Sequence, residues 1–266
     1  MKNNEKYSGR RILYGYSLVV LLLCHFFTSC TSNNSSAEKV PNDTIYVHDT
    51  VSIGGSFIYN LPCKVEYIHP EKSGKAILLF WLHGGVHDQP AHNLLNAANN
   101  HIDQWRNTAH NAFSEYLKSN DIKAVYVTPI CHKAEVNHCV RWIDCWNDIE
   151  KIMDDYVDCG IVDESRIYIA GCSDGGAGVW DFIEYHGNRL AAAMSFSCGS
   201  PRMTTVPVYY SSTSAEGDKT SIVNDMKAKG ANIQYTFVPG KHGEDEKLTL
   251  SGSYLKAFFD NVKPAK

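Results

Sequence analysis

The sequence lacks the features that mark several classes of protein. Its 266 residues carry a formal net charge of −4, so no surplus of basic residues is present to hold nucleic-acid phosphates. It contains no internal repeat of fixed period, no C-x-x-C pair and no H-E-x-x-H motif. His83, His87 and His92 are close in sequence, but without such a carboxylate spacing they do not indicate a zinc site. We therefore expect no metal, no cofactor and no nucleic-acid partner.

The apolar run near the N-terminus is short for a membrane span. The apolar run over residues 12–27 is 16 residues long and is interrupted by tyrosines and a glycine, whereas a spanning helix needs about 20. Basic residues precede this run and small residues follow it, which is the shape of a secretory signal. The segment Phe27-Thr28-Ser29-Cys30 resembles a bacterial lipoprotein cleavage box, which implies a lipid on Cys30. An uncleaved single-span anchor is the alternative.

These features predict three regions. Residues 1–29 are expected to be a lipoprotein signal peptide, and residues 30–50 a lipidated cysteine followed by a flexible, polar tether. Residues 51–266 are long enough for one large domain with a well-buried core. We expect the protein to be lipid-anchored in a bacterial cell envelope, at the outer membrane, in the periplasm or at the cell surface.

The cysteines fit an exported protein without defining a disulfide framework. Seven follow Cys30, an odd number, so at least one stays free or pairs between chains. Cys131 and Cys139 are eight residues apart in a loop-like stretch and are a candidate disulfide in an oxidising compartment.

Apolar runs and helical periodicity alternate along the rest of the chain. The apolar run over residues 75–82 is nearly continuous, as expected of a strand buried on both faces. Strands are predicted over 44–48, 64–69, 75–82, 121–128, 165–170, 190–196, 206–210 and 233–238, and helices over 97–118, 144–159, 175–186, 221–229 and 247–259. This alternation predicts an α/β fold with a mainly parallel sheet and helices on both faces.

One glycine-rich turn joins a predicted strand to a predicted helix. Gly171-Cys172-Ser173-Asp174-Gly175 fits the pattern G-x-S-x-G, in which a serine occupies a sharp strand-to-helix turn. The flanking residues must be small because strand and helix pack closely at this point. The N-terminus of the helix directs free N–H groups to the place where an oxyanion would form.

Three segments together resemble a known family. They are Leu82-His83-Gly84-Gly85, the stretch from Val162 to Gly176, and Pro239-Gly240-Lys241-His242-Gly243. They resemble α/β-hydrolases, in particular secreted esterases related to polyhydroxybutyrate depolymerases and feruloyl esterases, and similar predicted peptidases. The resemblance covers about residues 76–259 and implies a serine, acid, histidine order along the chain.

The resemblance implies a catalytic triad. Ser173 would be the nucleophile, and His242, in the loop after the last strand, would be its general base. Asp218 would orient His242, with Glu216 and Asp225 as rivals; N-capping of the helix near residue 220 is the competing role for Asp218.

The resemblance also implies the groups around the triad. The oxyanion hole is expected from the backbone N–H groups of Asp174 and Gly85. Trp142 or His132, which follow a strand end, are candidates to line a substrate cleft. A surface loop with one packed tryptophan is the alternative.

The function implied by the resemblance is hydrolysis of carboxylic esters through an acyl-enzyme. Export and tethering favour acylated polysaccharides or their fragments as substrates. A serine peptidase with the same triad and a non-catalytic carbohydrate-binding surface protein are the alternatives.

Overall fold

A computed structural model of the chain describes residues 45–47, 51–53, 57–59, 61, 63–85, 108–129, 131 and 142–264. All of them belong to one compact unit, residues 39–266. The predicted signal peptide and Cys30 lie outside the described residues. Within the described ranges, none of the helices has the length and apolar character that a membrane span requires.

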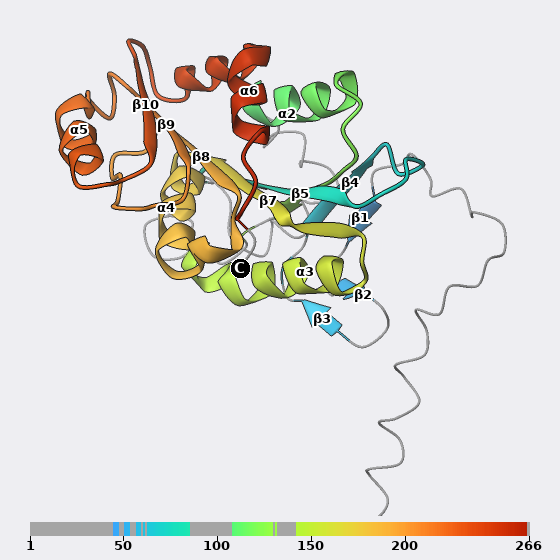
Figure 1. Cartoon of the computed structure of the whole chain (residues 1–266). Helices are drawn as coiled ribbons and strands as arrows, with labels where there is room; N and C mark the ends of the chain where they lie inside the picture. Colours follow the sequence, from blue (N-terminus) through green and yellow to red (C-terminus); the bar gives the residue numbers. More distant parts are fainter. Residues whose placement is uncertain are drawn as a thin grey trace, which may run out of the picture. The chain divides into compact units, whose positions relative to one another are not determined.

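A mainly parallel sheet of eight strands forms the centre of the unit (Figure 1). The strand order is β1-β4-β6-β5-β7-β8-β9-β10. β4 runs antiparallel to both of its neighbours, whereas all other neighbouring strands are parallel. The strands are β1 (Ile45–Val47), β4 (Cys63–Ile68), β5 (Ala76–Leu82), β6 (Ala124–Pro129), β7 (Val162–Cys172), β8 (Ala192–Phe196), β9 (Val208–Thr213) and β10 (Ile233–Val238). β2 (Val51–Ile53) and β3 (Phe57–Tyr59) form a separate antiparallel pair.

The sheet begins earlier than the predicted boundary of the domain. β1 lies inside the range 30–50 that was predicted to be tether, yet it pairs with β4 over three residues. The folded domain therefore includes residues before 51.

Alternating side chains of each central strand enter two different cores. In β5, Leu78, Phe80 and Leu82 join one hydrophobic cluster, while Ile77, Leu79 and Trp81 join the other. Every residue of β5 is buried, as expected of a parallel strand covered on both faces.

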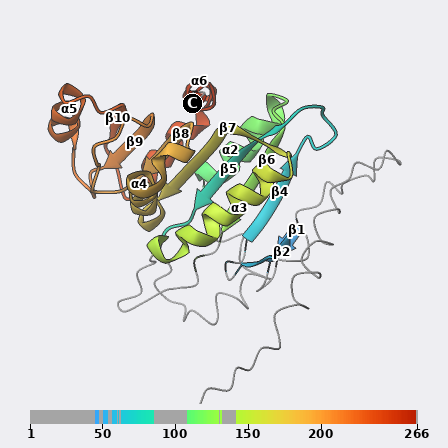
Figure 2. The ribbon, with the colours of Figure 1, turned by 60° about the horizontal axis from the view of Figure 1, so that its bottom comes forward.

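Helices cover both faces of the sheet, which confirms the predicted layering (Figures 1 and 2). α3 (Trp146–Asp158) and α4 (Asp174–His186) pack in the first cluster, preceded by the short helix η2 (Trp142–Cys145). α2 (Thr108–Ser119) and α6 (Gly252–Phe259) pack in the second. The remaining helices of the described residues are η3 (Gly187–Arg189), α5 (Thr220–Ala228) and η4 (Glu244–Leu250).

Among the predicted element boundaries that differ from the structure, two bear on the candidate site. β9 continues to Thr213, so residues 211–213 are buried strand residues and not a loop. The predicted helix over 247–259 is divided, because Ser251 is extended (φ −82°, ψ 111°) and separates η4 from α6.

Candidate active site

Ser173 occupies the turn between β7 and α4, as the G-x-S-x-G motif predicts. Its backbone has φ 58° and ψ −122°, a region that residues other than glycine rarely occupy. The Ser173 N–H donates to the Phe196 carbonyl at the end of β8, 3.0 Å away. The turn is therefore held in a strained conformation by the neighbouring strand.

The glycines of the motif are required by close backbone contacts. A Cβ added to Gly171 would lie 2.5 Å from the Gly175 carbonyl oxygen, and one added to Gly175 would lie 2.1 Å from that of Leu82. A Cβ on Gly176 would lie 2.6 Å from the Phe196 carbonyl oxygen. These distances are below any real Cβ contact, so the sequence pattern reflects a steric requirement.

The loop after β5 contacts the serine directly. A Cβ added to Gly84 would lie 3.2 Å from Ser173 Cβ and 3.3 Å from the Cys172 carbonyl oxygen. His83 Nδ1 and the Gly84 carbonyl oxygen are 2.7 Å apart. Because the peptide group is planar and trans, this bond directs the Gly85 N–H away from His83.

His83 is a buried structural residue. Its Nε2 accepts the Cys131 N–H at 3.1 Å, so its Nδ1 carries the proton that is donated to Gly84. Burial lowers the pKa of His83 to about 4, against the opposing effect of the Gly84 bond. The ring is therefore neutral near pH 7 and connects the loop after β5 to the end of β6.

The prediction that Trp142 lines a substrate cleft is wrong. Its side chain is buried, donates from Nε1 to the His83 carbonyl at 3.2 Å, and packs beside the His83 ring. It also leaves no room for a side chain at Gly178 of α4. Trp142 therefore supports the β5 loop from the interior. His132, the other predicted cleft residue, lies outside the described residues.

A histidine–carboxylate pair lies beyond the ends of β9 and β10. His242 Nδ1 is 2.5 Å from Glu216 Oε1, while Glu216 Oε2 accepts the Thr213 N–H and hydroxyl at 2.9 and 2.7 Å. Burial raises the pKa of Glu216, but the bonds from His242 and Thr213 outweigh it and hold the pKa below its ordinary value. A carboxylate on Nδ1 leaves Nε2 of the imidazole as a proton acceptor.

The carboxylate that contacts His242 is Glu216, not the predicted Asp218. Asp218 instead accepts bonds from the Thr220 N–H and hydroxyl at 2.8 and 2.6 Å, at the start of α5. The reason is the length of β9. Because the strand runs to Thr213, Glu216 falls in the turn directly after it, whereas Asp218 lies two residues before α5.

Consecutive residues at the end of β8 bring the two parts of the site together. Phe196 accepts the Ser173 N–H, and the next residue, Ser197, accepts the Gly243 N–H on its hydroxyl at 2.7 Å. Ser173 and the residue after His242 are thus attached to one short segment.

Asp245, which sequence reasoning missed, anchors this segment. It is fully buried and accepts the Ser197 N–H at 2.7 Å, the Ser197 hydroxyl at 2.5 Å and the Ser211 hydroxyl at 2.7 Å. Its position three residues after His242 and the polar run at the end of β9 were the available signals.

Glu246 was missed as well. It is buried, accepts the Ala109 N–H of α2 at 3.4 Å, and forms a side-chain hydrogen bond with Cys172, the residue before Ser173. Burial raises the pKa of Glu246 to about 7, although the bonds from Cys172 and Ala109 oppose this rise.

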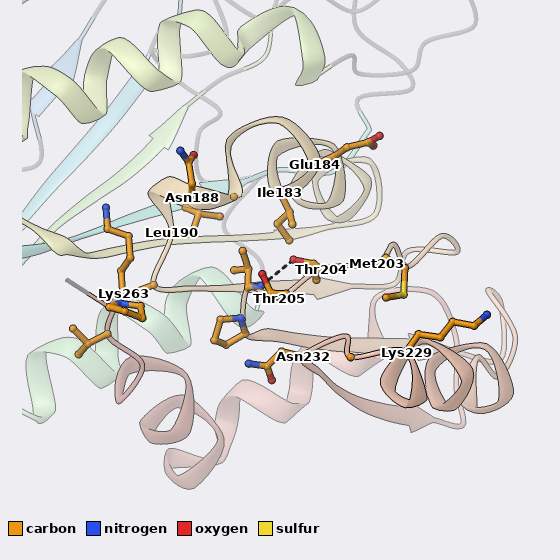
Figure 3. A pocket seen from close by; sticks show the side chains of 17 residues that line it. Ile183, Glu184, Asn188, Leu190, Met203, Thr204, Thr205, Lys229, Asn232 and Lys263 are labelled. Carbon is orange, nitrogen blue, oxygen red and sulfur yellow. Dashed lines mark hydrogen bonds between the residues drawn. The ribbon is translucent and has the colours of Figure 1, made fainter. Parts of the chain in front are cut away.

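Among the described residues, a metal site or a pocket away from Ser173 and His242 would be an alternative to this site. In the ranges the structure describes, His, Cys, Asp and Glu form no group of three able to hold a metal. A surface pocket is lined by residues that precede β8 to β10, among them Leu190, Thr204 and Asn232, and by residues of α4 and of the segment after α6 (Figure 3). Strand N-termini lie at the opposite edge of a parallel sheet from Ser173, so this pocket is separate from the site.

No protein-family model and no curated protein matches the sequence. Among solved structures, the chain is similar to a thermostable esterase (TM-score 0.64, 16% identity), covering 83% of this chain and 63% of the esterase. It is also similar to a mutant feruloyl esterase module from Clostridium thermocellum complexed with sinapinate (TM-score 0.54, 14% identity). This match covers 85% of this chain and 92% of the module. A third similar structure is a putative dipeptidyl aminopeptidase IV from Bacteroides ovatus (TM-score 0.55, 11% identity). This match covers 82% of this chain and 36% of the aminopeptidase.

The strand order, the strained serine turn and these similarities define the α/β-hydrolase fold, as the sequence resemblance implied. The chain spans 63% of the length of the thermostable esterase and about a third of the length of the aminopeptidase.

Proposed function

We propose that this chain is a serine hydrolase that cleaves carboxylic esters through an acyl-enzyme. Ser173 Oγ attacks the ester carbonyl, and His242 Nε2 takes the serine proton and returns it to the departing alcohol. Glu216 accepts a hydrogen bond from the Nδ1–H of His242 and stabilises the imidazolium that forms. The observation that carries this proposal is the Glu216–His242 pair, held at the same end of β8 as the strained turn of Ser173.

The oxyanion hole of this proposal uses two backbone N–H groups. Asp174 is the first residue of α4, so its N–H has no partner within the helix. Gly85 supplies the second N–H, whose direction is set by the bond of the Gly84 carbonyl to His83. The absence of a side chain at Gly84 keeps this loop close to Ser173.

Acylated polysaccharides or their fragments are the proposed substrates. The fold similarity to a feruloyl esterase module complexed with sinapinate supports this class by association. The predicted export of the chain also favours an extracellular polymer.

Steady-state hydrolysis of three substrates tests the proposal. We expect p-nitrophenyl acetate and methyl ferulate to be hydrolysed, a peptide p-nitroanilide to be nearly untouched, and Ser173→Ala to lose the activity. Ser119→Ala, which changes an exposed serine at the end of α2, serves as the matched control. Hydrolysis of the esters by Ser173→Ala at the wild-type rate would contradict the mechanism.

A serine peptidase is the second candidate, and the similarity to a putative dipeptidyl aminopeptidase supports it. Faster turnover of peptide p-nitroanilides than of both esters, lost in Ser173→Ala, would favour the peptidase. Absence of turnover of all three, together with binding of a polysaccharide, would favour the non-catalytic carbohydrate-binding role.

We also propose that Cys30 is lipidated and holds the domain at a bacterial membrane. The support is the sequence alone, from the signal-like N-terminus and the small residues before Cys30. Wild-type chain should incorporate radiolabelled palmitate and fractionate with membranes, whereas Cys30→Ser should do neither. Labelling of Cys30→Ser at the wild-type level would contradict this proposal.

A further inference from the structure

Two buried cysteines lie in contact at the base of the β5 loop. Cys131 follows β6 and Cys145 ends η2, and their sulfur atoms are 3.3 Å apart. Both side chains are fully buried within the first hydrophobic cluster. A disulfide has a sulfur–sulfur distance of about 2.05 Å, so a shift of little more than 1 Å would join them.

We infer that Cys131 and Cys145 form a disulfide when the chain folds under oxidising conditions. This pairing replaces the Cys131–Cys139 pairing suggested by spacing; Cys139 lies outside the described residues. The inference rests on the contact between the two sulfurs and is independent of the proposed hydrolase activity.

The oxidant is a low-molecular-weight disulfide such as oxidised glutathione. One cysteine thiolate attacks the external disulfide and releases one external thiol, leaving a mixed disulfide. The second thiolate then attacks the protein sulfur of that mixed disulfide and releases the second thiol. Two S–H bonds are lost and one S–S bond forms, while the external disulfide is reduced to two thiols. Because both sulfurs are inaccessible in the folded domain, the exchange takes place during folding.

The position of the bond connects it to the loop beside Ser173. The Cys131 N–H donates to His83, and Trp142, in the same short helix as Cys145, donates to the His83 carbonyl. A disulfide therefore joins the two segments that form hydrogen bonds with His83. It closes a loop of 15 residues, which constrains the unfolded chain.

Peptide mapping tests the inference directly, because trypsin separates the three cysteines. The full chain is refolded in a glutathione redox buffer, alkylated under denaturing conditions and digested. Cys131 falls in the fragment 124–133, Cys139 in 134–141 and Cys145 in 142–151. We expect the first and third fragments to be linked, with Cys139 alkylated. Cys172 and Cys198, in fragments 167–189 and 190–202, are expected to be alkylated and serve as internal controls.

Two variants complete the test. Cys139→Ser should keep the linked fragments, whereas Cys145→Ser should lose them. Oxidation should raise the Tm of wild type and of Cys139→Ser by roughly 5 to 10 °C, and should leave the Tm of Cys145→Ser unchanged. Full alkylation of Cys131 and Cys145 in the refolded wild-type chain would overturn the inference. A link between fragments 124–133 and 134–141 would overturn it as well and would support the pairing suggested by spacing.

Discussion

The turn that carries Ser173 is enclosed by backbone atoms, whereas the loops that carry Glu216 and His242 are held by polar side chains. Around Ser173, the glycines of the motif lie against the carbonyl groups of neighbouring strands. Around His242, whose side chain is 51% exposed, the contacts are bonds to Glu216 and, through Ser197, to Asp245. The first part depends on the absence of side chains and the second on their hydrogen bonds. Substitutions of the glycines around Ser173 should therefore mainly affect stability, and substitutions of the polar side chains around His242 should mainly affect catalysis.

The largest effect should come from Glu216, the first of the two carboxylates that follow β9. In the proposed mechanism Glu216→Gln removes the charge that orients His242 and stabilises its cation, so kcat for p-nitrophenyl acetate should fall about 10³- to 10⁴-fold. Asp218→Asn, the matched control, should leave kcat within about twofold, because Asp218 contacts Thr220 at the start of α5. The reverse pattern would show that Asp218 orients the base during catalysis.

A side chain added to the serine turn should mainly lower stability. Gly175→Ala places a Cβ against the Leu82 and His83 carbonyls, so the free energy of unfolding should fall by about 3 kcal/mol. Gly252→Ala adds a Cβ at the start of α6 with no atom within 4 Å, and should be neutral or slightly stabilising. Urea denaturation followed by circular dichroism measures both. Equal stabilities would show that the turn can relax at no cost.

Glu246 should make the stability depend on pH. Its folded-state pKa of about 7 exceeds the ordinary value of 4.5, so it adds no penalty below pH 4.5 and destabilises the fold as pH rises through 7. Glu246→Gln keeps the shape of the neutral carboxyl. It should match wild type at pH 4.5 and exceed it by about 2 to 3 kcal/mol at pH 8.

His83 is neutral in the folded state and contributes the opposite slope, since its stabilisation is lost between about pH 6.5 and 4. Both proteins retain His83, so its effect cancels in the difference between them. A difference that is constant from pH 4.5 to 8 would contradict the raised pKa of Glu246.

The smallest effect should come from the anchor behind His242. Asp245→Asn places an amide NH₂ where a carboxylate oxygen accepted a hydrogen bond from the Ser197 hydroxyl. This change weakens the hydrogen bond that the Gly243 N–H donates to Ser197. We expect kcat to fall about tenfold with KM nearly unchanged, because the base and not the binding surface is displaced. Asp260→Asn, a surface partner of Lys256, should change neither constant. A rise in KM alone would assign Asp245 to substrate binding.

The part of the site that sequence could predict is the part that depends on backbone packing. The continuous apolar run of β5 predicts a strand that is covered on both faces. The spacing of Gly171, Ser173 and Gly175 predicts the serine turn. Trp142 was misassigned because its position after a strand suggested a cleft, while tertiary packing buries it.

The acid could not be chosen because the end of β9 could not be located. Ser211, Ser212 and Thr213 are polar and read as a loop, yet bonds to Asp245, Gly217 and Glu216 satisfy their hydroxyls inside the sheet. These partners are distant in sequence or lie across a turn, so no local pattern reveals them.

Active-site labelling tests the central proposal most directly. The native chain is treated with a fluorophosphonate, digested with trypsin and mapped by mass spectrometry. The fragment 167–189 contains one serine, Ser173. The proposal predicts one adduct on Ser173, lost in denatured protein and strongly slowed in Glu216→Gln. Native protein that is not labelled at Ser173, or label that forms equally fast in Glu216→Gln, would contradict the proposed triad.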